Sequence, residues 1–411
     1  MNPTRLFLAA CLHLMSLGFL SAQITMVGVS QNSATGNLDV IRWDAVTGVV
    51  FQTVPTTENS LYMASSALDV STGKYYFRGL NGLQEIGFFP PQVRANSLQF
   101  DLGNTEVDMR TGKLYGLNYT PVTNPNGQII SGQLSVTEYV IADSTETLVY
   151  NLPQVLGYYA DASAFDSNHG TYYFLGIDSL LGSCLYKVNL SGTTISHTVI
   201  PVANNSRMFF TLEYDNDTNT LLGLGVTPDS NGIASNLQVL EMDTLTAQVT
   251  LVRELLNIYS FQSASTTYDQ ANHTMAFIAF DAVMTFMAYD RVNDSLYSLI
   301  LPGVNTQEIE ADNTQYALAR YRSTTRNDKL TSMSLLTVWP QPATDWIWVE
   351  GSADIRTLEL YDIQGRRVYQ GSTSNQQVSI AGIPDGMYMV RALDRNGMLV
   401  GNARIMKKGG K

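Results

Sequence analysis

Cysteine is nearly absent from this chain of 411 residues, which contains only Cys11 and Cys184. Cys11 lies in an apolar N-terminal segment with the features of a removable signal, so one thiol is expected to remain. A chain with one thiol cannot form an internal disulfide, and its core must be stable without covalent cross-links. Cys184 lies in a predicted strand, where we expect a buried, inert thiol.

Charged residues are scarce too, at 15% of the chain, against roughly 25% in typical soluble domains. The 24 basic residues are outnumbered by 36 acidic ones, and no cluster of Lys and Arg occurs before the last few residues. Nucleic acids and anionic membranes are bound by basic surfaces. The net charge of −12 therefore argues against both as partners.

Motifs of catalysis and metal binding are also missing. The sequence has no G-x-S-x-G, P-loop or dinucleotide fingerprint. His169, His197 and His273 are scattered, without the spacing of metal ligands. We therefore assign no catalytic residue and no cofactor, and we favour a role other than catalysis.

The N-terminus, MNPTRLFLAACLHLMSLGFLSAQ, has Arg5, then an apolar run from Leu6 to Leu20, then small residues. This pattern predicts a secretory signal peptide over residues 1–22. The run is short for a membrane span, and no later segment is long and apolar enough to be one. The mature protein is expected to be exported.

A hairpin pattern recurs along the chain, first in LDVSTGKYYF (68–77) and then in VDMRTGKLYG (107–116). Each copy has alternating apolar residues, an Asp, three turn-forming residues and a second alternating stretch, which is the signal of a β-hairpin. The Asp residues of this class are Asp69, Asp108, Asp166, Asp215, Asp269 and, in a degenerate copy, Asp312. A second class of hairpin turns at Asp44, Asp143, Asn189, Asp243 and Asp290.

Two hairpins give four strands per unit at a period of roughly fifty residues, which is typical of a β-propeller blade. The copy at Asp312 lacks its second half, whereas residues 24–44 resemble the outer strands of a blade. The two ends of the repeat region should therefore complete one blade and close the ring. We predict an all-β fold with a six-bladed propeller over residues 23–323, with seven blades as the alternative.

The recurring Asp has a structural explanation, because its carboxylate accepts hydrogen bonds from backbone N–H groups in a tight turn. The alternative is calcium. In Asp215-Asn216-Asp217-Thr218-Asn219 oxygen ligands alternate, although the glycine and the downstream Glu of an EF-hand are missing. We favour turns, and keep Ca²⁺ at Asp215 and Asp217 as the alternative.

After Arg322 the alternation stops, and residues 324–334 form a polar linker. Residues 335–411 contain about seven short strands, with expected hairpin turns at 362–366, 384–386 and 394–397. This pattern predicts a small, immunoglobulin-like antiparallel β-sandwich.

Several motifs of this last region occur together. They comprise Pro340, Pro342, Asp362, Gly365, Arg366, Pro384, Gly386 and Tyr388. On these residues, the segment from about 335 to 408 resembles the type A C-terminal sorting domain of type IX secretion cargo in Bacteroidota. The resemblance implies partners in the type IX secretion and sortase machinery, passage through the periplasm, and attachment to the cell surface or release.

In the propeller, a ligand is expected at the mouth of the central channel, near the loops that enter each innermost strand. The residues predicted there are Tyr62, Tyr158, Tyr159, Asp161, Arg207, Phe209, Tyr259 and Gln262. Aromatic rings beside directional polar groups suit a glycan, a peptide or a matrix component. One alternative is a hydrolytic enzyme that uses carboxylates such as Asp161 and Glu308. The other is a structural envelope protein without a ligand.

Overall fold

The computed structural model describes residues 24–408, apart from 63, 71, 127–128, 203–206, 229–235, 281–283, 301–305, 322–336, 341, 351–354, 363–365, 373–376, 394 and 396–398. The predicted signal peptide (1–22), the linker (324–334) and Gly365 lie outside the described residues. One helix and 32 strands are described, so the all-β fold class is confirmed. None of the described helical structure is long and apolar enough to cross a membrane.

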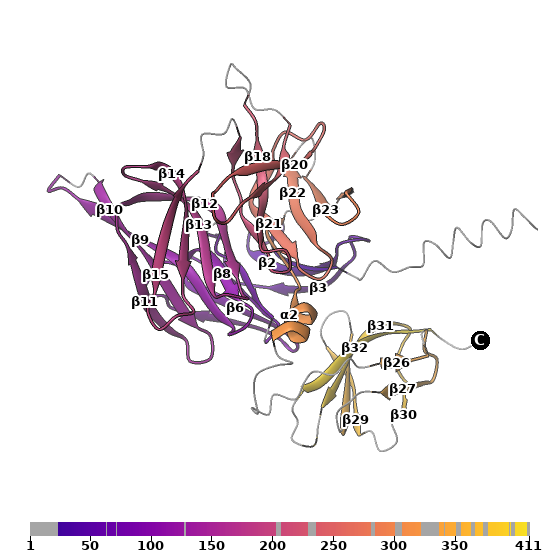
Figure 1. Ribbon diagram of the computed structural model, residues 1–411. Coiled ribbons are helices and arrows are strands. Elements are labelled where there is room, and N and C mark those ends of the chain that lie inside the picture. The colour runs from indigo at the N-terminus through magenta and orange to yellow at the C-terminus, as the bar shows by residue number, and fades with distance from the viewer. Residues whose placement is uncertain are drawn as a thin grey trace, which may run out of the picture.

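Six antiparallel sheets follow one another between residues 25 and 311 of the described chain (Figure 1). The first sheet contains β25 (Thr306–Ala311), β1 (Thr25–Gln31), β2 (Leu38–Asp44) and β3 (Val50–Pro55). The second contains β4 (Ala67–Asp69), β5 (Lys74–Gly79), β6 (Gly82–Phe88) and β7 (Pro91–Asn96). The third contains β8 (Gly103–Asp108), β9 (Lys113–Thr123), β10 (Ile129–Val140) and β11 (Thr145–Leu152).

The remaining three sheets repeat this order. The fourth contains β12 (Val155–Asp166), β13 (Thr171–Asp178), β14 (Gly182–Asn189) and β15 (Ser196–Pro201). In the fifth, β16 (Met208–Phe209) and β17 (Glu213–Asp215) both pair with β18 (Thr220–Val226), followed by β19 (Gln238–Met242) and β20 (Val249–Glu254). The sixth contains β21 (Phe261–Asp269), β22 (Thr274–Phe280), β23 (Met284–Asp290) and β24 (Ser295–Ile300).

The first strand of each sheet is its innermost strand. These strands contact one another in a closed cycle, in the order β25, β4, β8, β12, β17, β21 and again β25. The cycle surrounds a channel, and the propeller-like fold is confirmed. β1 pairs with β25, with Met26 opposite Ala311, so the N-terminal strands complete the sheet that the C-terminal strand begins.

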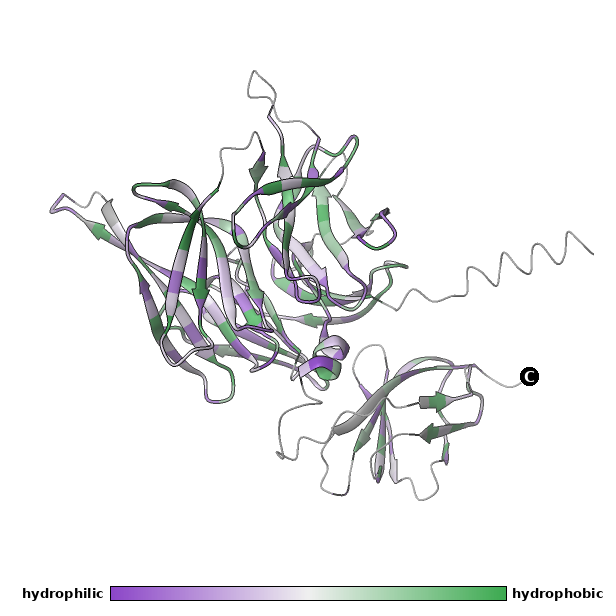
Figure 2. Cartoon of the chain, in the orientation of Figure 1, coloured by the Kyte–Doolittle hydropathy of each residue, from purple (hydrophilic) through white to green (hydrophobic). Residues whose placement is uncertain are grey.

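Apolar side chains fill the spaces between neighbouring sheets. One core cluster, for example, joins Leu117 and Val136 of the third sheet to Phe174 and Tyr186 of the fourth. The strands accordingly show alternating hydrophobic and hydrophilic segments (Figure 2). Cys184 is fully buried in the same cluster, as expected for an inert thiol.

The expected role of the recurring Asp is confirmed. Asp166 Oδ1 accepts hydrogen bonds from the backbone N–H of Asn168 at 2.9 Å and of His169 at 3.0 Å. The same two-bond turn occurs after Asp215 and Asp269. Because each innermost strand runs toward its Asp, these turns gather at one end of the channel, which we call the turn end.

The hairpin predicted at Asp312 is wrong. After β25 the chain enters a helix, α2 (Thr314–Tyr321). At the start of this helix, the backbone N–H of Thr314 donates a hydrogen bond to Asp312 Oδ1 at 3.2 Å. The physical reason is that β1 already occupies the place beside β25, so this segment finds no strand partner. Instead, Ala317 is buried in a small cluster with Val70 and Met109 at the turn end.

The C-terminal region forms the expected sandwich of two sheets. One sheet contains β26 (Thr337–Trp339), β27 (Trp346–Glu350) and β30 (Gln377–Ser379). The other contains β29 (Arg367–Ser372), β28 (Thr357–Tyr361), β31 (Gly386–Leu393) and β32 (Leu399–Lys407). The hairpin expected at 384–386 is wrong, because β30 pairs with β27 whereas β31 pairs with β28 and β32. This turn crosses between the two sheets, so that both can bury their apolar faces.

Candidate functional site

The two ends of the channel differ in what covers them. At the turn end, α2 lies across several sheets. Tyr321 donates a hydrogen bond to Asn168 at 3.1 Å, and Arg320 pairs with Asp217. The opposite end, where the innermost strands begin, is the mouth. Residues that precede the innermost strands, or that form the early part of these strands, lie at this end, and the predicted ligand-binding residues belong to this set.

Tyr62 precedes the innermost strand of the second sheet and is 43% exposed. The guanidinium of Arg78 lies 4.0 Å from the centre of the Tyr62 ring. Arg78 also forms an ion pair with Asp101 at 2.7 Å. Tyr158 lies beside this pair. Burial raises the pKa of Tyr158, Asp101 adds to that effect, and Arg78 opposes it. The mouth therefore holds an arginine stacked on an aromatic ring and fixed by a carboxylate.

Tyr159 and Tyr259 are exposed, at 38% and 63%. Phe210 is exposed as well and stacks against Phe261 with ring centres 6.1 Å apart. Gln262 is half-buried, and its carbonyl accepts a hydrogen bond from the hydroxyl of Ser265. The exposed rings come from different sheets, and each precedes an innermost strand or lies in its early part, which places them at the mouth.

Arg207 and Phe209 are less exposed than these rings. Arg207 is half-buried, and its Nε has no hydrogen-bond partner in the described part of the chain. Phe209 is buried, with 9% exposure, in the core cluster between the fourth and fifth sheets. The structure therefore gives Phe209 a packing role.

Asp161 lies where the mouth narrows into the channel. It has a left-handed backbone (φ 66°), and Ala64 and Ala264 adopt the same conformation at equivalent points of their sheets. Its Oδ1 is buried without a partner among the residues described. Burial raises the pKa of Asp161, although hydrogen bonds from Ala264 and Ser263 oppose the shift.

Asp161 also lines a cavity in the channel, together with three further carboxyl side chains from alternate sheets, Glu106, Glu213 and Glu310. We call these three residues the glutamate ring. The intervening sheets contribute hydroxyl groups to the same cavity, so that acid and hydroxyl alternate in the order Glu310, Ser66, Glu106, Ser163, Glu213 and Thr266.

Each hydroxyl is paired with one acid of the glutamate ring. Ser66 donates to Glu310 at 2.9 Å, and Ser163 donates to Glu106 at 2.7 Å. Thr266 makes the corresponding hydrogen bond to Glu213. The ring of six sheets therefore carries a threefold repeat of one acid–hydroxyl pair.

The electrostatic setting of the glutamate ring is unfavourable for charge. Burial raises the pKa of Glu106 to about 8, against a weaker opposite effect of the Ser163 hydroxyl. Burial and then repulsion from Glu106 raise the pKa of Glu213 far above its usual range. Burial, Glu213 and Glu106 do the same to Glu310. No Lys, Arg or His lies within ion-pair distance of these acids in the described chain.

Glu308, the other carboxylate of the enzyme alternative, lies above the ring on β25. It is fully buried, its Oε1 accepts a hydrogen bond from the N–H of Ser65 at 3.3 Å, and its Oε2 has no partner among the described residues. Burial raises its pKa to about 8, and Asp161 adds to the shift. The two acids are electrostatically coupled, but a side chain with 0% exposure cannot contact a substrate held at the mouth.

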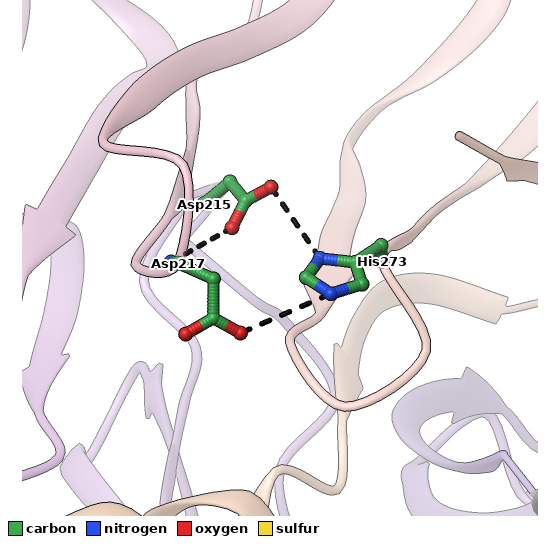
Figure 3. Close-up of side chains that lie close together, drawn as sticks. All are labelled: Asp215, Asp217 and His273. Carbon is green, nitrogen blue, oxygen red and sulfur yellow. Dashed lines mark hydrogen bonds and ion pairs between the residues drawn. The ribbon is translucent and has the colours of Figure 1, made fainter. Parts of the chain in front are cut away.

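Asp215, Asp217 and His273 at the turn end bring ligand atoms within 4.8 Å of one another, so the three residues could hold a metal ion (Figure 3). The same carboxylates are already paired. Arg291 lies 3.0 Å from Asp215 Oδ2, and Arg320 pairs with Asp217. Tyr268 also donates to Asp215 at 2.9 Å.

The glutamate ring was missed by the sequence analysis, although the sequence contains a signal for it. Glu stands two residues before the turn Asp in alternate hairpins, as Glu106-Val-Asp108, Glu213-Tyr-Asp215 and Glu310-Ala-Asp312. The other hairpins have Ser or Thr three residues before the Asp, at Ser66, Ser163 and Thr266. The repeat of Glu at the same position is visible when every second hairpin is aligned.

In the C-terminal sandwich, the motif residues form a connected unit. Tyr388 is buried, and its hydroxyl donates to the carbonyl of Pro384 at 2.7 Å. Asp362 accepts hydrogen bonds from the backbone N–H and the Nε of Arg366, at 3.0 and 2.8 Å. The backbone N–H of Ala343, next to Pro342, donates to Met406 at 2.7 Å and ties the entry of the domain to its last strand.

Comparison with known proteins identifies this unit. Residues 337–407 match the family described as "Secretion system C-terminal sorting domain". The chain carries a type IX secretion sorting domain. This sorting domain makes the protein a type IX cargo, and it implies interaction with that machinery and export to the cell surface or beyond.

The propeller has less informative relatives. No curated protein sequence matches the chain. Among solved structures, apo AztD from Citrobacter koseri is 10% identical, with a TM-score of 0.39 over 71% of this chain and 98% of that one. A gluconolactonase from Xanthomonas campestris is 13% identical, with a TM-score of 0.39 over 65% of this chain and 86% of that one. At these values the likeness carries no argument about ligand or activity.

Proposed function

We propose that the propeller is a binding module that acts outside the cell on a glycan, a peptide or a matrix component. The observation that carries this proposal is the exposed aromatic mouth, with Tyr62, Tyr159 and Tyr259 around a channel whose other end is covered by α2. Exposed rings provide stacking surfaces, and Arg78, Asp161 and Gln262 provide directional polar groups beside them.

The sorting route gives this module its place. We propose that residues 1–22 direct export to the periplasm of a Bacteroidota cell and are removed there. The propeller (23–323) is joined by a linker (324–334) to the sorting domain (335–411), which the type IX and sortase machinery recognises and cleaves. The mature propeller is then attached to the cell surface or released.

Binding is tested by measuring the melting temperature of the full chain against panels of glycans and peptides, because a ligand of the folded state raises it by mass action. We expect Tyr259→Ala and Tyr62→Ala to weaken the binding of a hit about tenfold, which is about 1.4 kcal/mol. Tyr297→Ala is the matched control, since Tyr297 is 56% exposed on the outer strand β24. A hit that the mouth variants bind as well as wild type would contradict the proposal.

Sorting is tested with the full chain and with a chain that ends at residue 336, both expressed in a host with type IX secretion. The full chain should become accessible to protease added outside the cell, whereas the shortened chain should remain in the periplasm. Tyr388→Ala should also be retained, because it removes a buried ring and the hydrogen bond to Pro384. Surface display of the shortened chain would refute this route.

A further inference from the structure

The glutamate ring has the features of a receptor for positive charge. We infer that the channel receives a linear alkylammonium group, from a polyamine or from the lysine side chain of a peptide, which enters through the mouth. This inference rests on the proposed function, and it specifies which chemical group of the ligand would enter the channel from the mouth.

The placement of the acids suits an ammonium group. Glu106, Glu213 and Glu310 line one cavity and alternate with hydroxyl groups around it. A primary ammonium has three N–H donors and no acceptor, so it can donate at once to one acid of the ring and to the hydroxyl oxygens on either side of that acid. The hydroxyls of Ser66, Ser163 and Thr266 can accept as well as donate, and they hold each acid in place.

An independent observation comes from Glu308. Its Oε2 is fully buried and has no hydrogen-bond partner among the described residues. Glu308 and Glu310 are alternate residues of β25 and therefore point to the same side of the strand. Its carboxyl also interacts with Ser66 and Asp161, which line the cavity. An unpartnered, fully buried carboxylate oxygen thus belongs to a side chain that lies next to residues lining the cavity.

The acids form two levels along the channel. Asp161 and Glu308 lie nearer to the mouth, and the glutamate ring lies below them. Glu308 and Glu310 are two residues apart on β25, and two residues of an extended strand span roughly 7 Å. A flexible alkyl chain that ends in an ammonium can pass the upper level and reach the lower one, as the four-carbon stem of lysine does.

A single metal ion fits this arrangement less well. Calcium ligands lie about 2.3–2.6 Å from the ion, so the oxygens of one site must be close together. Among the described residues, the potential ligand atoms that lie this close, within 4.8 Å of one another, belong to Asp215, Asp217 and His273. These residues are at the turn end, outside the channel. The carboxyls of the channel are more widely spread, as an extended organic cation requires.

The test is calorimetric titration of the full chain with spermidine, with a short lysine-containing peptide and with Ca²⁺. The two amine arms distinguish a polyamine from a peptide side chain as the source. We expect amine binding to release protons, measured in buffers of different ionisation enthalpy, because neutral glutamic acids must ionise to hold the cation. We expect Glu213→Gln and Glu106→Gln each to weaken binding at least tenfold, or about 1.4 kcal/mol.

Glu254→Gln is the control, because Glu254 is exposed on β20 and its substitution removes one charge without touching the channel. It should leave the affinity within about twofold. Equal affinity for the amine in wild type and both channel variants would overturn the inference, as would absence of amine binding or preferential binding of Ca²⁺ in the channel. Loss of ligand binding in Tyr259→Ala, with no amine effect in Glu213→Gln, would leave the proposed function standing alone.

Discussion

The turn end and the channel interior contain the same kind of group in opposite surroundings. At the turn end, Asp215 is fully buried but accepts hydrogen bonds from two backbone N–H groups, from Tyr268 and from Arg291. In the channel, Glu106, Glu213 and Glu310 each have a single hydroxyl partner, and no cation lies nearby in the described chain. The difference separates a structural carboxylate from a carboxylate available for a ligand.

The two settings have opposite effects on ionisation. Burial alone would raise the pKa of Asp215, yet hydrogen bonds from Asp217, Thr218 and Tyr268 lower it. Burial without such compensation raises the pKa of Glu106 to about 8. Ionised Asp215 thus stabilises the fold, whereas ionisation of Glu106 opposes folding.

The largest effect is expected when the turn end is made to resemble the channel. Arg291→Met removes the cation that lies 3.0 Å from Asp215 and 2.6 Å from Glu241. The loss should destabilise the protein by about 3 kcal/mol, because a buried charge loses its partner. Thermal unfolding should show a melting temperature lower by roughly 6–10 °C.

Arg253→Met is the control for this change. Arg253 forms its ion pair with Asp294, whose side chain is 71% exposed, and such surface pairs contribute little. Its melting temperature should stay close to that of wild type. If both variants lose the same stability, Arg291 has no special role at the turn end.

The next prediction concerns pH. The pKa of Glu106 is raised in the folded state. The contribution of Glu106 to the free energy of unfolding is therefore fully present below its pKa in the unfolded chain, near 4.5, and is lost as pH rises through about 8. Glu106→Gln removes this loss, so its stability relative to wild type should rise by roughly 3 kcal/mol from pH 5 to pH 8. Denaturant unfolding at both pH values measures the difference, and Glu254→Gln should show none. A constant difference between Glu106→Gln and wild type would mean that Glu106 titrates normally.

A smaller effect is expected from the helix that covers the turn end. Tyr321→Phe removes a hydroxyl that lies 3.1 Å from Asn168 and 3.3 Å from Asn216. The cost should be about 1 kcal/mol, the typical contribution of a hydrogen bond. Tyr297→Phe, on an exposed ring, serves as the control in the same unfolding experiment. Equal stability of both variants would show that these hydrogen bonds do not hold α2 in place.

The smallest effect is expected from calcium. Because Arg291 and Arg320 already pair with Asp215 and Asp217, we expect Ca²⁺ or EDTA to move the melting temperature by less than about 1 °C. A larger rise with Ca²⁺ that is lost in Asp217→Asn would show instead that the ion displaces the arginines.

Much of the architecture could be predicted from local sequence. The alternation around Asp69, Asp108 and Asp166 specifies hairpins, because strand period and turn chemistry act between residues that are close in the chain. The sandwich could be predicted for the same reason, whereas its sorting motifs were recognised by their resemblance to a known family. The error at Asp312 arose where a distant segment, β1, took the place beside β25 that a local pattern had suggested for residues 314–321.

The candidate site depended on long-range contacts. The exposed rings of Tyr62, Tyr159 and Tyr259 were expected at the mouth, because each precedes an innermost strand or lies in its early part. The glutamate ring could not, because Glu106, Glu213 and Glu310 are far apart in sequence and meet only when the ring closes. Their pKa values depend on burial and mutual repulsion, which exist only in the closed ring. Sequence by itself determined the repeating hairpins and the sorting domain, and tertiary structure alone decided which acids face one another without a cation.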